Sequence, residues 1–282
     1  MTMTLAASRL ARASCIVALA GAGVTSPIGA QTSFGQVFTG RDAAILGAGA
    51  VGSAGLSLFD VRVARFFADS SLHRRKRFQT IAKRTSFVTE TVLMLTGTAV
   101  WGVARLARDP GTADVALHAT ESVASGAAFI QVIRGIGGRA RPYVVSASGE
   151  SRDSDPYDFE WFKGFSSFDY RSFPSMHAMA SFAAATALSQ EMKARHTRDR
   201  KILSPLLYIA ATATPAARLY LDEHWASDIA LGAFLGIYAG QKVVTYSHSH
   251  PRSRVDRFFL KPESRIGLVI DGRGASLHLW PF

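Results

Sequence analysis

The chain has 282 residues, of which 48% are hydrophobic and 19% are charged, and this composition excludes a disordered chain and a collagen-like repeat. Lys and Arg total 32 against 21 Asp and Glu, which gives a formal net charge of +11. Such an excess favours anionic partners, namely phosphate esters, anionic lipid or nucleic acid.

The first thirty residues have the layout of a secretory signal peptide. Arg9 and Arg12 form a basic start, the apolar run SCIVALAGAGV follows, and SPIGA offers small residues for cleavage. The apolar run is too short to span a bilayer comfortably. We therefore predict a signal peptide at 1–30, and a mature chain without cysteine because Cys15 is the only one.

From residue 42 onward, apolar segments of helical length or period dominate the chain. They cover 42–59, 86–107, 114–134, 176–194, 202–217 and 226–245. A basic amphipathic stretch, 61–84, separates the first two segments. The pattern predicts an all-α domain over 31–250, folded as a helical bundle of about six helices.

Two other stretches lie between or after these segments. The polar loop 143–173 is rich in acidic and aromatic residues and long for a compact domain, so it either shapes access to a site or is a solvated loop. The tail, 251–282, reads as two short strands on either side of Asp271-Gly272, which predicts a small C-terminal β-hairpin.

Two short motifs carry candidate anion-binding groups. In RGIGGRARP, Arg134 and Arg141 bracket glycine-rich backbone after an apolar helix, which suits a phosphate; a basic helix end that favours the helix dipole is the alternative. In SFPSMHAMASFAAA, Ser175 and His177 stand in the first turn of an alanine-rich helix. Free N–H groups at such a start bind anions, whereas a lone histidine is usually structural.

A third motif, ARLYLDEHWASD, carries Arg218, His224 and Asp228. His224 and Asp228 are four residues apart and so share one face of a helix. The carboxylate can fix the tautomer of the imidazole and leave its other nitrogen free as a base or nucleophile. For this stretch taken alone, an ion pair at a helix start is the alternative.

In their order along the chain, Arg-x6-Arg-Pro, Pro-Ser-x-His and Arg-x5-His-x3-Asp resemble the type-2 phosphatidate phosphatase and vanadium haloperoxidase superfamily, over about residues 40–246. That family carries Lys-x6-Arg-Pro, Pro-Ser-Gly-His and Ser-Arg-x5-His-x3-Asp. Arg134 replaces Lys, Met176 replaces Gly and Ala217 replaces Ser. None of these changes removes a catalytic group, but we expect the Met176 side chain to crowd the site.

The resemblance implies a phosphohistidine mechanism. His224 would attack phosphorus, Asp228 would orient it, and His177 would act as general acid and then as general base. A set of cationic and backbone groups would hold the phosphoryl oxygens: Arg134, Arg141, Ser175, Met176 and Arg218. No metal or cofactor is implied, the sequence shows no cluster of metal ligands, and we expect His248 and His250 to lie in a solvated tail.

We therefore expect a metal-independent phosphatase that acts on phosphate monoesters or diphosphates, with phosphorylated small molecules or lipid phosphates as substrates. A vanadate-dependent haloperoxidase and a non-enzymatic basic anion-binding protein are the alternatives. No nucleic-acid-binding motif accompanies the positive charge, and the sequence leaves the oligomeric state unknown.

Many relatives of this family have six spanning helices, but two features of this sequence oppose that arrangement. If all six segments crossed, the basic stretches 61–84 and 191–201 would lie on opposite faces, against the positive-inside rule. The segments are also short, and the fifth contains Pro205 and Pro215. We expect an exported, periplasmic bundle that is soluble or contacts the membrane surface; the alternative is an integral inner-membrane protein with a periplasmic active site.

Overall fold

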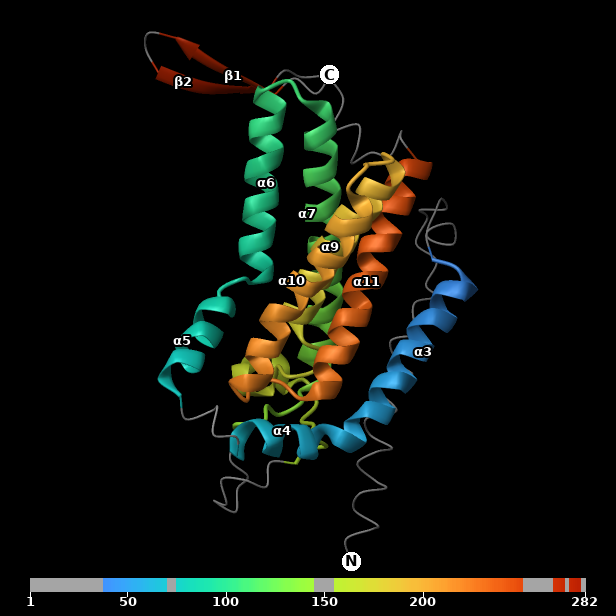
Figure 1. The fold of residues 1–282 in the computed structure, drawn as a ribbon, viewed down its shortest axis with the longest axis vertical. Helices are drawn as coiled ribbons and strands as arrows, with labels where there is room; N and C mark the ends of the chain where they lie inside the picture. Colours follow the sequence, from blue (N-terminus) through green and yellow to red (C-terminus); the bar gives the residue numbers. More distant parts are fainter. Residues whose placement is uncertain (1–37, 70–74, 145–154, 251–265, 272–273, 280–282) are drawn as a thin grey trace, which may run out of the picture.

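The computed structural model describes residues 38–69, 75–144, 155–250, 266–271 and 274–279 (Figure 1). The predicted signal peptide at 1–30 lies outside these residues. Most of the described chain is helical, as the predicted all-α class requires. The longer helices are α3 (Gly40–Leu56), α4 (Asp60–Asp69), α5 (Lys76–Thr85), α6 (Glu90–Leu106), α7 (Pro110–Gly137), α9 (Met176–Ala194), α10 (Arg200–Tyr220) and α11 (Ala226–Ser249). Short turns of helix are η1 (Ser57–Phe59), α8 (Lys163–Ser166) and η2 (Phe168–Tyr170).

Each of the predicted apolar segments lies largely within one of these helices, and the basic stretch between the first two forms α4 and α5. Helices α7, α9, α10 and α11 run side by side, and α4 lies across the lower end of this bundle in Figure 1. The apolar core lies between α7, α9 and α11 and includes Val123, Ile130, Met179, Leu231 and Leu235.

Glycines on α11 bring this helix unusually close to α9. A Cβ atom on Gly232 would lie 2.4 Å from the carbonyl oxygen of Ser175, and one on Gly236 would lie 2.3 Å from that of Met179. Any larger residue would therefore push the two helices apart. The amide of Ser175 donates to the carbonyl of Asp228 at 3.0 Å, so the first turns of α9 and α11 are held together.

The end of α7 also depends on a glycine. Gly138 adopts φ 56°, a left-handed conformation that commonly ends a helix. A Cβ atom there would overlap the carbonyl oxygen of Glu160. Because the helix stops at this point, Arg139 and Arg141 run across the end of the bundle instead of continuing along α7.

Two described helical segments are long and apolar enough to cross a membrane, judged by length and composition: Gly40–Phe67 and α10. A third would be α5 with α6, which meet at a bend of 51°. The fifth segment, which was expected to be short, forms the 21-residue helix α10 and continues through Pro205 and Pro215. Each proline removes one backbone donor without ending the helix. These findings favour the integral-membrane alternative over a soluble bundle.

Near the C-terminus, β1 (Ile266–Asp271) pairs antiparallel with β2 (Gly274–Leu279). The residues that would form the turn, 272–273, lie outside the described chain. The hairpin about Asp271-Gly272 therefore stays a prediction, and so do the predicted domain boundaries.

Candidate active site

The predicted site residues lie at helix ends on one side of the bundle, the lower end in Figure 1. Arg134 is in the last turn of α7, His177 is in the first turn of α9, Arg218 is near the end of α10, and Asp228 is in the first turn of α11. The pKa of His177 is lowered by burial and by the nearby charges of four of these residues: Arg218, His224, Arg141 and Arg134. Segments more than forty residues apart in sequence thus meet in one cluster.

Two of the arginines are buried with unused hydrogen-bonding capacity. Arg134 and Arg218 are each only 7% exposed. Within the described residues, the Nε atom of each is buried and has no hydrogen-bond partner. A buried cation is costly unless an anion pairs with it. These two donors are therefore suited to an anion that enters the site.

The third arginine of the cluster shares a carboxylate with one of these two. Arg141 donates through Nη1 to the Glu223 carboxylate, and Arg218 donates through Nη2 to the same oxygen at 2.8 Å. The guanidinium of Arg141 also lies 4.0 Å from the ring centre of Phe168. Glu223 thus lies between two arginines that were predicted to hold phosphate. Sequence reasoning missed it; the available signal was an acidic residue directly before His224.

His224 is almost fully buried beside Asp228. Its Nδ1 atom lies 3.6 Å from Oδ2 of Asp228, which is beyond hydrogen-bond distance, and among the described residues it has no hydrogen-bond partner. The same Oδ2 accepts from Ser172 Oγ at 2.5 Å and from the Trp225 amide at 2.8 Å. The carboxylate is therefore anchored, and a small movement of the imidazole would complete the His224–Asp228 hydrogen bond.

Arg139, which sequence reasoning missed, is the structural centre behind this pair. It is 2% exposed and donates to Asp228 Oδ1 at 2.5 Å, to Asp60 Oδ2 at 2.7 Å and to Ser227 Oγ at 2.9 Å. Its Nε atom donates to the carbonyl of Pro156 at 2.8 Å. Arg139 thus links α4, the polar loop and α11. In the first motif, Arg139 is one of the six unspecified residues between Arg134 and Arg141. The available signal was this third arginine, for which the Arg-x6-Arg-Pro pattern gives no role.

Residues of the polar loop help to hold these arginines. The carbonyl of Pro156 accepts from Arg139, and the carbonyl of Phe168 accepts from Nε of Arg141 at 3.2 Å. The amide of Arg141 donates to the carbonyl of Asp169 at 2.9 Å. The described part of the loop, from residue 155, is therefore packed against the site. It differs in this respect from the solvated loop that was one of the two expectations.

The first turn of α9 presents backbone donors to the same region. Ser175 is the N-cap, and its hydroxyl accepts from the Ala178 amide at 3.4 Å. The amides of Met176 and His177 lie in the first turn, where a helix supplies no acceptor of its own. The Met176 side chain belongs to the apolar core with Phe173 and Met179. The expectation that it crowds the site is wrong, because the helix directs it inward.

Burial and neighbouring charges determine the protonation of the site. Burial lowers the pKa of His224 to about 4, although Asp228 acts in the opposite direction. Burial lowers the pKa of His177 to about 3, and the charges of Arg218 and His224 lower it further. Burial alone would raise the pKa of Asp228, but the Arg139 charge and His224 lower it. At neutral pH both imidazoles are therefore uncharged and Asp228 is ionised.

Potential metal ligands meet elsewhere, at the opposite end of the bundle. His118, Glu191 and His248 bring one ligand atom each within 4.8 Å of one another. His118 Nδ1 and His248 Nε2 lie 2.7 and 2.9 Å from Glu191 Oε1, and Arg195 donates to Oε2 of the same carboxylate. His248 and His250 are both exposed, as expected, but His248 also pairs with the buried Glu191. The sequence showed no such cluster because its members are far apart along the chain.

Comparison with known proteins places a family match on the segment that carries these motifs. Residues 115–251 match the model of the PAP2 superfamily, which confirms the resemblance predicted from the three motifs. Among solved structures, the chain is similar to the first transmembrane PAP2 type phosphatidylglycerolphosphate phosphatase from Bacillus subtilis, with 16% identity and a TM-score of 0.33. That alignment covers 72% of this chain and 98% of the other. No curated protein matches.

Proposed function

We propose, from the PAP2 superfamily match over residues 115–251, that this chain is a metal-independent phosphatase that acts on lipid phosphates, either monoesters or diphosphates, through a phosphohistidine intermediate. One observation carries the proposal. The arginines Arg134 and Arg218 are buried near enough to His177 to lower its pKa, and within the described residues their Nε atoms have no hydrogen-bond partner. A phosphoryl group would pair with these donors, and the cluster would surround it with positive charge on several sides.

The first proposed step forms the phosphohistidine. The uncharged His224 attacks phosphorus through Nε2, and the bond from phosphorus to the leaving oxygen breaks. The imidazole gains positive charge, which Asp228 stabilises through Nδ1 as the present 3.6 Å separation shortens. His177 gives its proton to the leaving oxygen, so the product alcohol departs uncharged. Arg134, Arg141 and Arg218 would hold the three non-bridging oxygens as charge moves onto the leaving group.

The second proposed step releases phosphate. His177, now neutral, accepts a proton from water while the water oxygen attacks phosphorus, and the phosphorus–nitrogen bond breaks. His224 returns to its uncharged form. Since the pKa of His177 is about 3 in the free site, it is protonated only after an anionic substrate raises that pKa. Substrate binding and proton uptake are therefore coupled.

The site end of the molecule supports a lipid as the source of the phosphate. Several aromatic side chains of the polar loop are exposed beside the arginines: Trp161, Phe162, Phe165 and Phe168. Phe59 and Phe66, on η1 and α4, are also exposed at this end. Exposed aromatic residues near candidate membrane spans are typical of contact with lipid. An exported chain with the site on the periplasmic side is the location that we propose.

The test is phosphate release by the purified chain with EDTA present. Substrates would be p-nitrophenyl phosphate, phosphatidate and an isoprenyl diphosphate. The proposed function predicts turnover that EDTA does not reduce and that His224→Ala abolishes. His250→Ala, an exposed histidine at the far end of the bundle, is the matched control and should keep full activity.

A second measurement addresses the intermediate directly. Acid-labile, base-stable phosphate on the protein after rapid quenching is the signature expected of a phosphohistidine, and His224→Ala should lack it. Full activity in His224→Ala would contradict the mechanism. No release from any substrate, together with vanadate-dependent bromide oxidation, would support the haloperoxidase alternative instead.

A further inference from the structure

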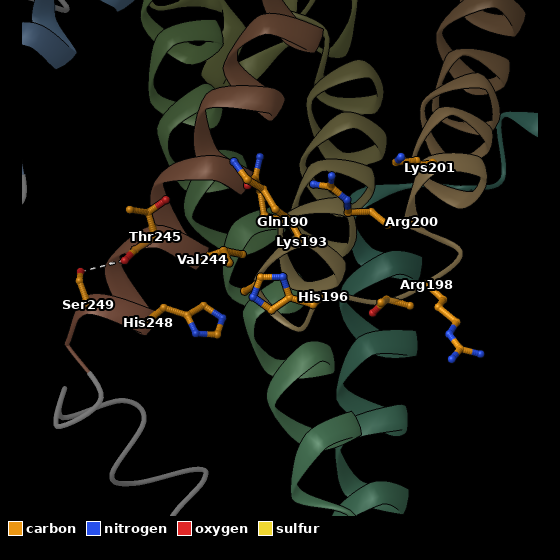
Figure 2. Close-up of a pocket in the computed structure, with 12 residues that line it drawn as sticks. Gln190, Lys193, His196, Arg198, Arg200, Lys201, Val244, Thr245, His248 and Ser249 are labelled. Atoms are coloured by element: carbon orange, nitrogen blue, oxygen red, sulfur yellow. Dashed lines mark hydrogen bonds between the residues drawn. The ribbon is translucent and has the colours of Figure 1, made fainter.

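A second charged concavity lies at the end of the bundle opposite the active site. It has a volume of about 870 Å³ and is formed by the end of α9, the α9–α10 turn, the start of α10 and the end of α11. Figure 2 shows its lining residues. None of the residues placed in the active site contributes to it.

The lining of this far pocket is basic. Six of its residues carry basic or imidazole groups: Lys193, His196, Arg198, Arg200, Lys201 and His248. No acidic residue is among the described residues that line it. The nearby Glu191 is 1% exposed and already binds His118, Arg195 and His248. Figure 2 shows the Arg200 guanidinium directed toward Gln190 and Lys193, whereas Arg198 points away.

An exposed apolar surface begins where the basic pocket ends. Helix α10 starts at Arg200 and is one of the segments long and apolar enough to cross a membrane. Immediately after Lys201, its exposed residues are apolar: Ile202, Leu203, Leu206 and Ile209. Positive charge at the head of an exposed apolar helix face matches an anionic headgroup joined to acyl chains.

We propose that the far pocket binds the headgroup of an anionic phospholipid. Its phosphate lies among Lys193, Arg200 and Lys201, and its acyl chains lie along the exposed apolar face of α10. The site is separate from the active site, since the two lie at opposite ends of α9 and α10. It therefore anchors the far end of the bundle at a lipid surface without taking part in hydrolysis.

The test is binding of dioctanoyl phosphatidylglycerol to the full chain in a non-ionic detergent, followed by native mass spectrometry or calorimetry. The variant is Lys193→Gln with Arg200→Gln and Lys201→Gln. Each basic residue contributes about 1 kcal/mol toward an anionic lipid surface, so the triple variant should bind about a hundredfold more weakly. Its hydrolysis of p-nitrophenyl phosphate should equal that of the parent chain, which also shows that it is folded.

A matched triple variant, Lys76→Gln with Arg77→Gln and Lys83→Gln, removes the same charge from exposed positions on α5. It should keep the parent affinity for phosphatidylglycerol, and neither triple variant should differ from the parent with dioctanoyl phosphatidylcholine. Equal losses in the two triple variants would overturn the proposal, because net charge alone would then explain binding. Inorganic phosphate that binds as tightly as the lipid would also overturn it, since the apolar face would contribute nothing.

Discussion

The two ends of this bundle are both basic, yet they hold their cations in opposite ways. At the active-site end, Arg134, Arg139 and Arg218 are each at most 7% exposed. At the far end, Lys193, Arg198 and Lys201 are exposed to solvent. Buried cations have fixed positions and weak screening, whereas exposed ones are mobile and screened by salt. The buried cations are therefore suited to catalysis at the active-site end, and the exposed cations are suited to attracting anionic lipid at the far end.

Two groups of carboxylates pair with arginines at the buried end. Asp60 and Asp228 pair with Arg139, and Glu223 pairs with Arg141 and Arg218. The first group is closed, because its carboxylates are fully buried. The second is partly open, since the Glu223 side chain is 23% exposed. Arg139 is therefore suited to a fixed structural role, and Glu223 to one that changes when substrate binds.

After the complete loss expected in His224→Ala, replacing His177 should have the largest effect, and the effect should depend on the leaving group. His177→Ala removes the proposed general acid, so hydrolysis of an alkyl phosphate such as phosphatidate should slow by about a hundred- to ten-thousand-fold. Hydrolysis of p-nitrophenyl phosphate should slow much less, because nitrophenolate leaves without protonation. Steady-state kcat on the two substrates measures this difference. Equal losses on both would contradict the role of His177.

Arg139→Ala should have the next largest effect, which is a loss of folding stability. It leaves Asp60 and Asp228 buried without their cation, which costs about 3–5 kcal/mol. Thermal unfolding in detergent measures the loss. Lys163→Ala, which breaks an exposed pair with Glu160, is the control and should change stability little. Similar losses in both variants would show that Arg139 does not organise the site.

The pH dependence of stability should report the two buried histidines. Their pKa values fall from 6.5 to about 4 for His224 and about 3 for His177, so below pH 6.5 the unfolded chain binds protons that the folded chain does not. The free energy of unfolding should therefore decrease as the pH falls from 6.5 toward 4. At the steepest, each histidine should contribute a decrease of about 1.4 kcal/mol per pH unit. His177→Gln should flatten the decrease between pH 6.5 and 5, whereas His250→Gln should not. An unchanged slope in His177→Gln would contradict the burial effect.

Glu223→Gln should have the smallest effect. Unlike the earlier variants, which lose activity or stability, it should bind phosphate more tightly. Its carboxylate competes with phosphate for Arg141 and Arg218, so the neutral amide should make inorganic phosphate inhibit about three- to tenfold more tightly, or roughly 1 kcal/mol. The inhibition constant against p-nitrophenyl phosphate measures this change. Glu160→Gln, the same substitution at an exposed position, should leave the constant unaltered. Weaker inhibition in Glu223→Gln would mean that the carboxylate supports the arginines instead of competing.

Local patterns were enough to predict the helices and the candidate site. Apolar periodicity locates the helices because each must bury one face, and the largest departures occur where α4 and α5 form from a basic amphipathic stretch. The three motifs locate the helix ends because the helix starts need caps and because i and i+4 residues share a face. The PAP2 superfamily match covers the same motifs.

Burial and pairing across the chain could not be predicted in this way. Nothing near Met176 in sequence indicates whether its side chain faces the core or the site; in the structure it packs in the apolar core between α7, α9 and α11. Arg139 pairs with Asp60, 79 residues away, and that contact depends on where α4 crosses the bundle. The same holds for His118, Glu191 and His248, which three helices bring together.

The sequence by itself determined which helix ends carry cations, histidines and a carboxylate, because those patterns depend on residues within one or two turns. Only the tertiary structure decided which of these cations are buried, which are paired and which remain open to an anion. The physical reason is that desolvation and ion pairing depend on every element packed around a group, and most of those elements are distant in sequence.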